Sequence, residues 1–521
     1  MDLHTPVGTS SSCSSGNVET EDVVPAVGIR TADDPNGHLW VSPSAPLLGE
    51  RLGNIMTSSE QYRRGSYTRA EPTLGVLAIC AIAYFNVCGG PWGSEAVISS
   101  VGPLPGLVGA IVFSVGWGLP LSLVTAELSS VFPDDGGYSI WVSEAFGEFW
   151  GFQESYWSWV SGVIDNAIYP VLAYESLIKL LDDDIFSLDD GDEYFSLGTA
   201  YMVKLTIAFA FTFPNLVTIR EFGPGLSFLA MFVFLPFLVL SFNALFLHGK
   251  ELNFANLLEV KHDARFGDWA DLINLLYWNF SGFDCVSTCA GSVCRPSQSY
   301  PRGLLLALVL ITLTYMLPLV ASVAINDPEW EYWDEGSFVT IAESLVGHWL
   351  AVWMVVASFA GNAGMHIAEM FEDSWQLCGM AEVGLAPSVF AYKHPHFKTP
   401  LISVMFSFVI IAGLIVNKFA FIVGISNFFS VASALLELSA FLKLRHSKSS
   451  LHRPFEVPIQ SNAGLGLFIL FPFAVGLIVL LSSFGNTLKS ISLNISALLF
   501  GVPLFFLMKY HGTIKYTRGR I

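Results

Sequence analysis

Long apolar runs dominate this sequence and constrain its fold more than any other feature. They recur along the chain, and a helix of about 20 apolar residues crosses the roughly 30 Å hydrocarbon core of a bilayer. The chain is 53% hydrophobic and only 13% charged, a composition that excludes a soluble protein of this length. Spans within lipid must satisfy their own backbone polar groups. The sequence therefore predicts an all-α integral membrane protein.

Twelve transmembrane helices are expected from the apolar runs and the residues that interrupt them. The predicted spans are 74–100, 105–131, 148–180, 197–217, 223–247, 269–293, 302–325, 338–371, 399–416, 419–444, 464–483 and 491–509. Residues 1–70 are rich in Ser, Gly, Thr and Pro and are predicted to form a disordered cytoplasmic tail. Residues 71–444 then form a transport core of ten spans, and residues 445–521 hold the last two spans and the C-terminus.

Two predicted spans contain helix breakers at membrane depth. In the first, "CGGPWGSE" places Gly89 and Gly90 shortly before Glu95, and in the sixth, "NFSGFD" places Gly282 before Asp284. Non-helical backbone at this depth is tolerated only where protein buries it or where it lines a cavity. Breaks in spans one and six predict a five-plus-five inverted repeat with discontinuous helices 1 and 6 and a site at the midplane. The alternative is a kinked helix that serves packing alone.

The distribution of basic residues favours one orientation. Of the 25 Lys and Arg residues, 18 lie in segments that are cytoplasmic if the N-terminus is inside, and 6 lie in the opposite loops. Because cytoplasmic loops carry an excess of Lys and Arg, both termini are predicted to be cytoplasmic. The remaining residue, Lys204, is expected to extend from a span end toward the headgroups. The plasma membrane is the expected location.

Five carboxylates lie in or at the ends of predicted spans, where ionisable groups are costly and indicate function by default. Glu95 and Asp284 follow the two breaks, although each could instead cap the helix that restarts there. Asp165 lies near the centre of the third span, and its alternative role is a structural pair with a buried polar group. Glu127 and Glu369 are expected near the cytoplasmic surface, in structural roles.

Several longer stretches carry a family resemblance. They are "GGPWGSE", "FPDDGGYSIWVSEAFGEFWGFQESYWSWVSGVIDNAIYPVL", "YWNFSGFDCVSTCAGSV", "NAGMHIAEMFEDSWQLCGMAEVGLAP" and "RPFEVPI". With them the chain resembles the amino acid–polyamine–organocation transporters over roughly residues 72–510. Within that superfamily it is most similar to the polyamine-uptake branch, which is related to the L-type amino acid transporters. Its sixth span reads "NFSGFD" where plant members usually show "NLNYWD".

The resemblance implies import of polyamines of the putrescine and spermidine class by alternating access, coupled to protons. A polyamine carries separated ammonium groups and no carboxylate, so its site needs separated acids with aromatic faces between them. Asp165 and Tyr169 are four residues apart and share a helix face. Trp278 is the favoured aromatic face, ahead of Trp92. The expected substrate-binding residues are Gly89, Gly90, Glu95, Asp165, Tyr169, Trp278, Asn279 and Asp284.

Proton coupling requires a group that carries the proton. Some relatives use a lysine in the fifth span, which has none here, so Glu95 and Asp284 are the candidates. No phosphate-binding loop appears, which excludes drive by ATP. The expected partners are a small cationic substrate, protons and the lipid bilayer. No cofactor, metal or nucleic acid is expected.

Other functions stay open at this point. The chain could transport cationic or neutral amino acids, with the substrate carboxylate on the N–H groups around Gly89 and Gly90. It could also be a nutrient sensor that does not transport, with the tail as its output. An enzyme is disfavoured because no nucleophile–base pair is apparent. L-type relatives can form a disulfide to a single-span partner through the loop after span three, but residues 181–196 contain no cysteine, so no such heavy chain is expected.

Overall fold

The structure is a computed structural model that describes residues 74–133, 136–184, 197–217, 222–247, 252–382, 385–484 and 488–510. Within these ranges the regular secondary structure is helical, apart from an isolated β-bridge between Leu74 and Val293. Eight of the described helices are long and apolar enough to cross a membrane. The predicted tail, the loop from residue 185 to 196 and the C-terminal residues from 511 lie outside the described residues.

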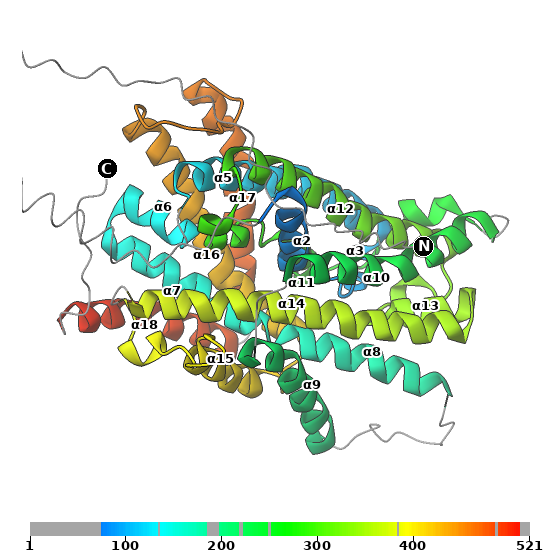
Figure 1. Ribbon diagram of the computed structural model, residues 1–521. Helices are drawn as coiled ribbons and strands as arrows, with labels where there is room; N and C mark the ends of the chain where they lie inside the picture. Colours follow the sequence, from blue (N-terminus) through cyan, green and yellow to red (C-terminus); the bar gives the residue numbers. More distant parts are fainter. Residues whose placement is uncertain are drawn as a thin grey trace, which may run out of the picture. The chain divides into compact units, whose positions relative to one another are not determined.

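The helices follow the apolar runs, and every predicted span contains one or more of them (Figure 1). Those that precede residue 250 are α2 (Val76–Val87), α3 (Glu95–Val101), α4 (Pro103–Phe113), the π-helical turn η1 (Ser114–Gly118), α5 (Leu119–Val131), α6 (Gly137–Phe146), α7 (Glu148–Asp165), α8 (Ile168–Asp184), α9 (Leu197–Val217), α10 (Phe222–Phe242) and the π-helical turn η2 (Asn243–Leu247).

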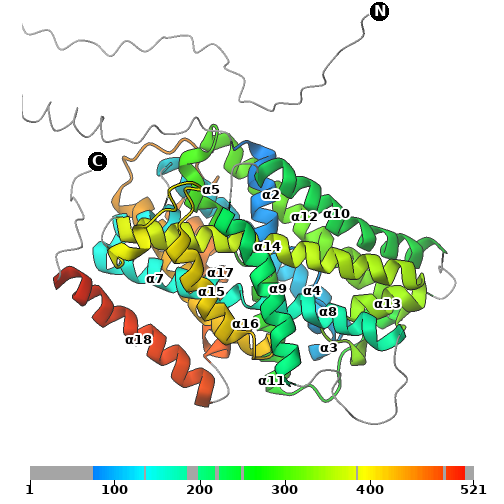
Figure 2. The ribbon, with the colours of Figure 1, turned by 60° about the horizontal axis from the view of Figure 1, so that its bottom comes forward.

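The later part of the chain continues in the same way. Its helices are η3 (Phe254–Leu258), α11 (Phe266–Phe280), η4 (Cys285–Ser292), α12 (Pro296–Ile325), η5 (Trp330–Tyr332), α13 (Ser337–Leu345), α14 (His348–Glu382), η6 (Ser388–Ala391), α15 (Leu401–Leu414), α16 (Phe419–Ser447), α17 (Asn462–Ser483) and α18 (Leu488–Tyr510). Figure 2 shows α14 running lengthwise through the bundle, where it contacts α2, α7, α8 and α10.

Both predicted breaks are present. The first separates α2 from α3 and contains Gly90 and Gly93 at φ values of 114° and 82°. The second separates α11 from the 3-10 helix η4 and contains Gly282 at φ 94°. Left-handed backbone of this kind is accessible to glycine without the steric penalty that a Cβ brings, so the glycines predicted as breakers also shape the turns.

The two broken segments lie side by side. A Cβ on Gly282 would overlap the backbone oxygen of Asn86, at the end of α2. At the other end of both segments, the N–H of Leu74 donates to Ser292 O at 3.0 Å, and the N–H of Cys294 donates to Leu74 O at 2.8 Å. The second break is therefore buried against the end of α2, and the far ends of the two segments are joined by backbone hydrogen bonds, as the interior of a bilayer requires.

The eighth predicted span is wrong in its boundaries. Residues 338–371 were expected to form one helix, but α13 ends at Leu345 and α14 runs from His348 to Glu382. Gly347, at φ 115°, separates them. Its left-handed backbone ends one helix and allows the next to start at an angle. Residues near 370 consequently lie well inside a long helix and not at its cytoplasmic end.

The contact between the breaks generates a stability prediction. Replacing Gly282 by alanine should lower the midpoint of thermal unfolding in detergent, because left-handed backbone costs a non-glycine residue about 1–2 kcal/mol and the new methyl group would overlap Asn86. The control is Gly413→Ala in α15, where a Cβ meets no atom within 4 Å and helix propensity improves. Equal unfolding midpoints for the two variants would contradict the prediction.

Candidate functional site

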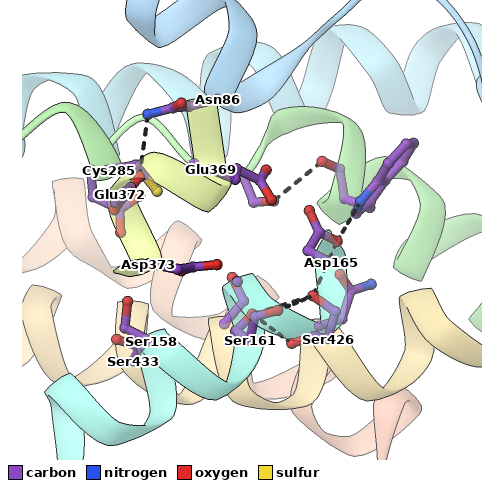
Figure 3. Close-up of a pocket in the computed structure, with 17 residues that line it drawn as sticks. Asn86, Ser158, Ser161, Asp165, Cys285, Glu369, Glu372, Asp373, Ser426 and Ser433 are labelled. Atoms are coloured by element: carbon purple, nitrogen blue, oxygen red, sulfur yellow. Dashed lines mark hydrogen bonds between the residues drawn. The ribbon is translucent and has the colours of Figure 1, made fainter. Parts of the chain in front are cut away.

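A buried polar cavity lies where the second break meets α7, α14 and α16 (Figure 3). Its volume is about 70 Å³. Five of the side chains that line it are carboxylates: Asp165, Asp284, Glu369, Glu372 and Asp373. Most of the others are serine and asparagine, and its lining contains no Lys or Arg. The cavity is therefore strongly acidic.

Asp165 is held by donors from three helices. Its Oδ2 accepts from the hydroxyl of Tyr169 at 3.0 Å, and its Oδ1 accepts from Nε1 of Trp278 at 3.0 Å. Ser426 Oγ of α16 lies 3.2 Å from Oδ1. The predicted proximity of Asp165 and Tyr169 is confirmed, although a turn at residues 166–167 separates them into α7 and α8 where one continuous helix was predicted. These fixed donors orient the carboxylate toward the cavity.

The Tyr169 hydroxyl links Asp165 to Glu369. It lies within hydrogen-bonding distance of Oε1 of Glu369 as well as of Asp165. A phenol has one proton to donate, so it can satisfy only one of the two carboxylates at a time. When Tyr169 donates to Glu369, Asp165 keeps the donors Trp278 and Ser426, and two adjacent carboxylates still form a favourable place for a positively charged group.

Three acids of α14 line the cavity, and the sequence did not predict any of them as site residues. Glu369, Glu372 and Asp373 share one face of the helix through their spacing of three and four residues. Glu372 accepts from the hydroxyl of Tyr138 at 3.0 Å, and Asp373 accepts from Nδ2 of Asn166 at 2.9 Å. The expectation that Glu369 lies near the cytoplasmic surface is wrong, because α14 begins later and extends further than predicted.

These cavity acids have no basic partner among the residues that the structure describes. The ion pairs found there involve other acids, such as Glu127 with Arg445 and Arg453. An isolated carboxylate that is removed from water is costly unless a cation, a proton or several donors compensate it. Five of them around one small cavity produce a negative potential that favours a cationic occupant.

Three of the predicted site residues line the cavity, namely Asp165, Trp278 and Asp284. Tyr169 contacts two of the lining acids without lining the cavity itself. Asn279 is buried next to the break, and its Oδ1 has no partner within the described chain. The break thus brings Trp278 and Asp284 to the site from the two sides of Gly282.

Gly89 and Gly90 lie elsewhere. They were expected to offer backbone groups to the substrate, but neither lines the cavity. Gly89 packs on α14, where its Cβ would lie 2.7 Å from Gly361 O and where its N–H donates to Sδ of Met365 at 3.0 Å. The glycine is needed for close helix packing, which the sequence does not reveal. Trp92 also packs in the core, 4.9 Å from the ring of Phe237.

Glu95 begins α3 and is fully buried away from the cavity lining. Its Oε1 accepts from the N–H of Gly336 at 3.1 Å, just before α13, while Oε2 has no partner within the described chain. Lys204 is paired with Glu175 at 3.5 Å and lies over the ring of Tyr174 at 4.7 Å. It therefore has a protein partner, where the sequence predicted contact with headgroups.

Further polar residues recur at helical spacing in α7 and α16, outside the predicted site residues except for Asp165. In α7 and in α16, polar side chains recur at positions i, i+4, i+7 and i+11, which places them on one stripe of each helix. The stripe of α7 is Glu154, Ser158, Ser161 and Asp165, and that of α16 is Ser426, Ser430, Ser433 and Glu437. This spacing was the signal available in the sequence.

A helical membrane protein with two broken spans and a buried polar cavity has the features of a permease. The chain belongs to the amino acid permease family, whose model matches residues 74–505. It is 35% identical over 418 residues to a probable polyamine transporter of Arabidopsis thaliana, which covers 80% of this chain and 83% of the relative. It is 34% identical over 432 residues to the Arabidopsis thaliana polyamine transporter RMV1, covering 82% and 84% of the two chains. It is also 34% identical over 432 residues to the polyamine transporter PUT1 of Oryza sativa subsp. japonica, covering 83% and 77%.

Glu127 tests the distinction between structural and site acids. At the end of α5 it accepts from Arg445 at 2.7 Å, from Arg453 at 3.2 Å and from the N–H of Val457 at 2.8 Å. Glu127→Gln should leave the buried arginines without a full partner, destabilise the protein by roughly 3–5 kcal/mol and leave the KM of the remaining carrier unchanged.

The measurements for Glu127→Gln are the thermal midpoint in detergent and substrate uptake per folded molecule. Glu456→Gln is the matched control, because Glu456 also pairs with Arg445 but its side chain is 51% exposed, so its effect on stability should be small. A raised KM at normal stability in Glu127→Gln would place this acid in substrate binding instead.

Proposed function

We propose that this protein is a secondary active transporter that imports polyamines of the putrescine and spermidine class by alternating access. The observation that carries the proposal is the group of five carboxylates around one cavity, without a basic partner in the described chain. The similarity to two polyamine transporters and one probable polyamine transporter supports it. A chain of ammonium groups supplies the positive charge that such a cavity lacks.

An amino acid substrate fits this cavity less well. Its carboxylate would enter a cluster of like charges, which opposes binding. Of the backbone groups around Gly89 and Gly90 that could hold this carboxylate, the N–H of Gly89 already donates to Met365. Transport of cationic or neutral amino acids is therefore the second candidate function, and membership in the amino acid permease family is consistent with it. The role of a sensor rests on the tail, outside the described residues, and has no support here.

In the proposed site, Asp165 and Glu369 hold one ammonium group beside the Tyr169 hydroxyl. Trp278 lines the cavity and donates to Asp165, so its ring can cover the substrate chain while its N–H fixes the acid. The cavity of about 70 Å³ has room for roughly five waters, at about 10–15 Å³ for each. That space suits part of a slender chain better than a bulky ring.

The proposed transport cycle rests on the two breaks. We place spans one to five and six to ten in an inverted repeat of twelve transmembrane helices, because the breaks fall in the first and sixth spans and their segments lie side by side. The excess of Lys and Arg supports cytoplasmic termini. Polyamine import suits the plasma membrane. The loop without cysteine supports a carrier without a disulfide-linked heavy chain, although residues 185–196 lie outside the described residues.

Proton coupling is proposed through Glu95 or Asp284. The α10 helix contains no lysine that could carry the proton. Glu95 accepts from Gly336 through one oxygen, while its other oxygen is unpaired in the described chain. A proton on Glu95 would weaken this hydrogen bond and release the segment before α13. Binding of a proton would then be linked to movement of that segment, as coupling by alternating access requires.

Asp165→Asn tests substrate binding. The change keeps the shape of the side chain and removes its charge, so it should cost a hydrogen bond to a charged group, about 1.5–3 kcal/mol, or roughly 10- to 150-fold in affinity. We expect the KM for labelled putrescine to rise accordingly in a transport-deficient cell, with normal amounts of carrier in the membrane. Asp263→Asn, in an exposed loop, is the control.

Uptake of labelled arginine in the same cells separates the two candidate functions. A carrier that transports arginine and not putrescine would refute polyamine import. A loss of Asp165→Asn protein from the membrane, with an unchanged KM for the part that remains, would instead assign Asp165 a structural role.

Glu95→Gln tests proton coupling. If Glu95 carries the proton, its replacement should flatten the dependence of putrescine uptake on external pH, while exchange of internal for external putrescine continues, since exchange needs no net proton movement. Measurement of both rates between acidic and neutral pH is sufficient. Uptake with the full pH response in Glu95→Gln, and its loss in Asp284→Asn, would assign the proton to Asp284.

A further inference from the structure

The structure contains a second group of acids at the end of the cavity opposite Asp165. We propose that Glu154, Glu437 and Asp284 form a second ammonium subsite, which holds the distal amine of triamines and tetraamines. This subsite rests on the proposed polyamine transport and makes it selective for chain length. It explains why the polar stripes of α7 and α16 continue beyond the acids that surround Asp165.

The two stripes face each other along the cavity. Ser161 Oγ of α7 lies 3.2 Å from Ser426 Oγ of α16, next to Asp165. Further along, Ser433 Oγ donates to Oε1 of Glu154 at 2.9 Å. The order of these contacts shows that the helices run antiparallel, so Glu154 and Glu437 meet at the same end. Figure 3 shows Ser158 and Ser433 grouped at one end of the cavity, with Asp165 and Ser426 at the other.

The acids at this end are buried and incompletely paired. Glu154 and Glu437 are 0% and 1% exposed. Oε2 of Glu154 and both oxygens of Glu437 have no hydrogen-bond partner among the described residues. The charge of Asp284 acts on both of them. Ser433 donates to one oxygen of Glu154 and compensates that acid only in part. The remaining negative charge of the three acids favours a cation between them.

The second group is connected to the cavity. Asp284 and Ser433 both line it, and Ser433 carries the hydrogen bond to Glu154. A ligand in the cavity therefore meets Asp284 and Ser433 directly, with Glu154 and Glu437 immediately behind them. In the proposed subsite, movement of these side chains brings Glu154 and Glu437 into contact with the ammonium group that Asp284 meets in the cavity.

The distance between the two groups sets the selectivity. Glu154 and Asp165 are eleven residues apart on α7, which corresponds to about 16 Å along the helix axis. A diamine of the putrescine class is too short to reach both groups, whereas a triamine or tetraamine extends from one toward the other. The second ammonium binds as part of the same molecule, so its contact adds to affinity without a second association step.

The test compares substrates of different length in the same variants. KM values for labelled putrescine, spermidine and spermine are measured with the full chain in transport-deficient cells at fixed pH, for Glu437→Gln and Glu154→Gln. We expect the KM for spermidine and spermine to rise about tenfold or more, while the KM for putrescine stays within about twofold. Glu382→Gln is the control, since its exposed carboxylate pairs with Lys393 at 2.7 Å, outside the site.

The outcomes separate this proposal from the function on which it rests. An equal rise for all three substrates, or no rise for any, would overturn the subsite and leave polyamine transport intact. A change in the pH dependence of all three, with the same preference for chain length, would assign the acids to proton movement and also overturn the subsite. Wild-type cells that take up none of the three would overturn both proposals.

A second measurement uses the wild-type protein and needs no variant that removes an acid. Purified wild-type carrier is heated in detergent with putrescine or spermine at the same concentration, and the shift in the unfolding midpoint reports binding. Spermine should raise the midpoint more than putrescine does, and Glu437→Asp, which keeps the charge, should preserve the difference. Equal shifts for the two amines in the wild-type protein would overturn the subsite.

Discussion

The interior of a bilayer does not tolerate backbone N–H and C=O groups that lack hydrogen-bond partners. The packing of the two broken segments reduces the exposure of such groups to lipid. Gly282 lies against the carbonyl of Asn86, and Leu74 exchanges backbone hydrogen bonds with Ser292 and Cys294. Each broken segment thereby covers or bonds the other. Gly89 then packs on Gly361 of α14. These contacts set the position of α14 against the breaks, and with it the position of every carboxylate that α14 contributes.

Charge within the cavity opposes the stability of the fold. The acids of α7, α14 and α16 are buried without basic partners in the described chain, and hydrogen bonds from Tyr138, Tyr169 and Asn166 compensate them only in part. At the end of α5, Glu127 is by contrast fully paired. Glu127 shows that this protein provides arginine partners for a buried acid that has a structural role. Incomplete pairing in the cavity indicates that a mobile cation supplies the rest.

Local sequence predicted the breaks and the pairing of Asp165 with Tyr169, because glycine conformation and helical spacing are properties of neighbouring residues. It failed for Glu369 because Gly347 moved the start of the helix, and the assigned depth moved with it. It did not indicate the packing of Gly89, which depends on Gly361, a residue far away in the sequence. The spacing of serines in the sequence indicates a polar stripe on α7 and another on α16. Only the antiparallel packing of the two helices shows that the two stripes form one surface.

The electrostatics of the empty carrier give a physical reason for coupling. In the proposed site, a polyamine that leaves the cavity takes away the charge that compensates the acids, so the return of the empty carrier would leave several buried carboxylates without a cation. Protons are the cations that can replace it without filling the cavity. Glu95 lies apart from these acids and accepts from the segment before α13, so it can report closure at the other end of the broken first span. If Glu95 also takes up a proton, as we propose, the broken first span that joins Asn86 to Glu95 connects that proton to the cavity acids.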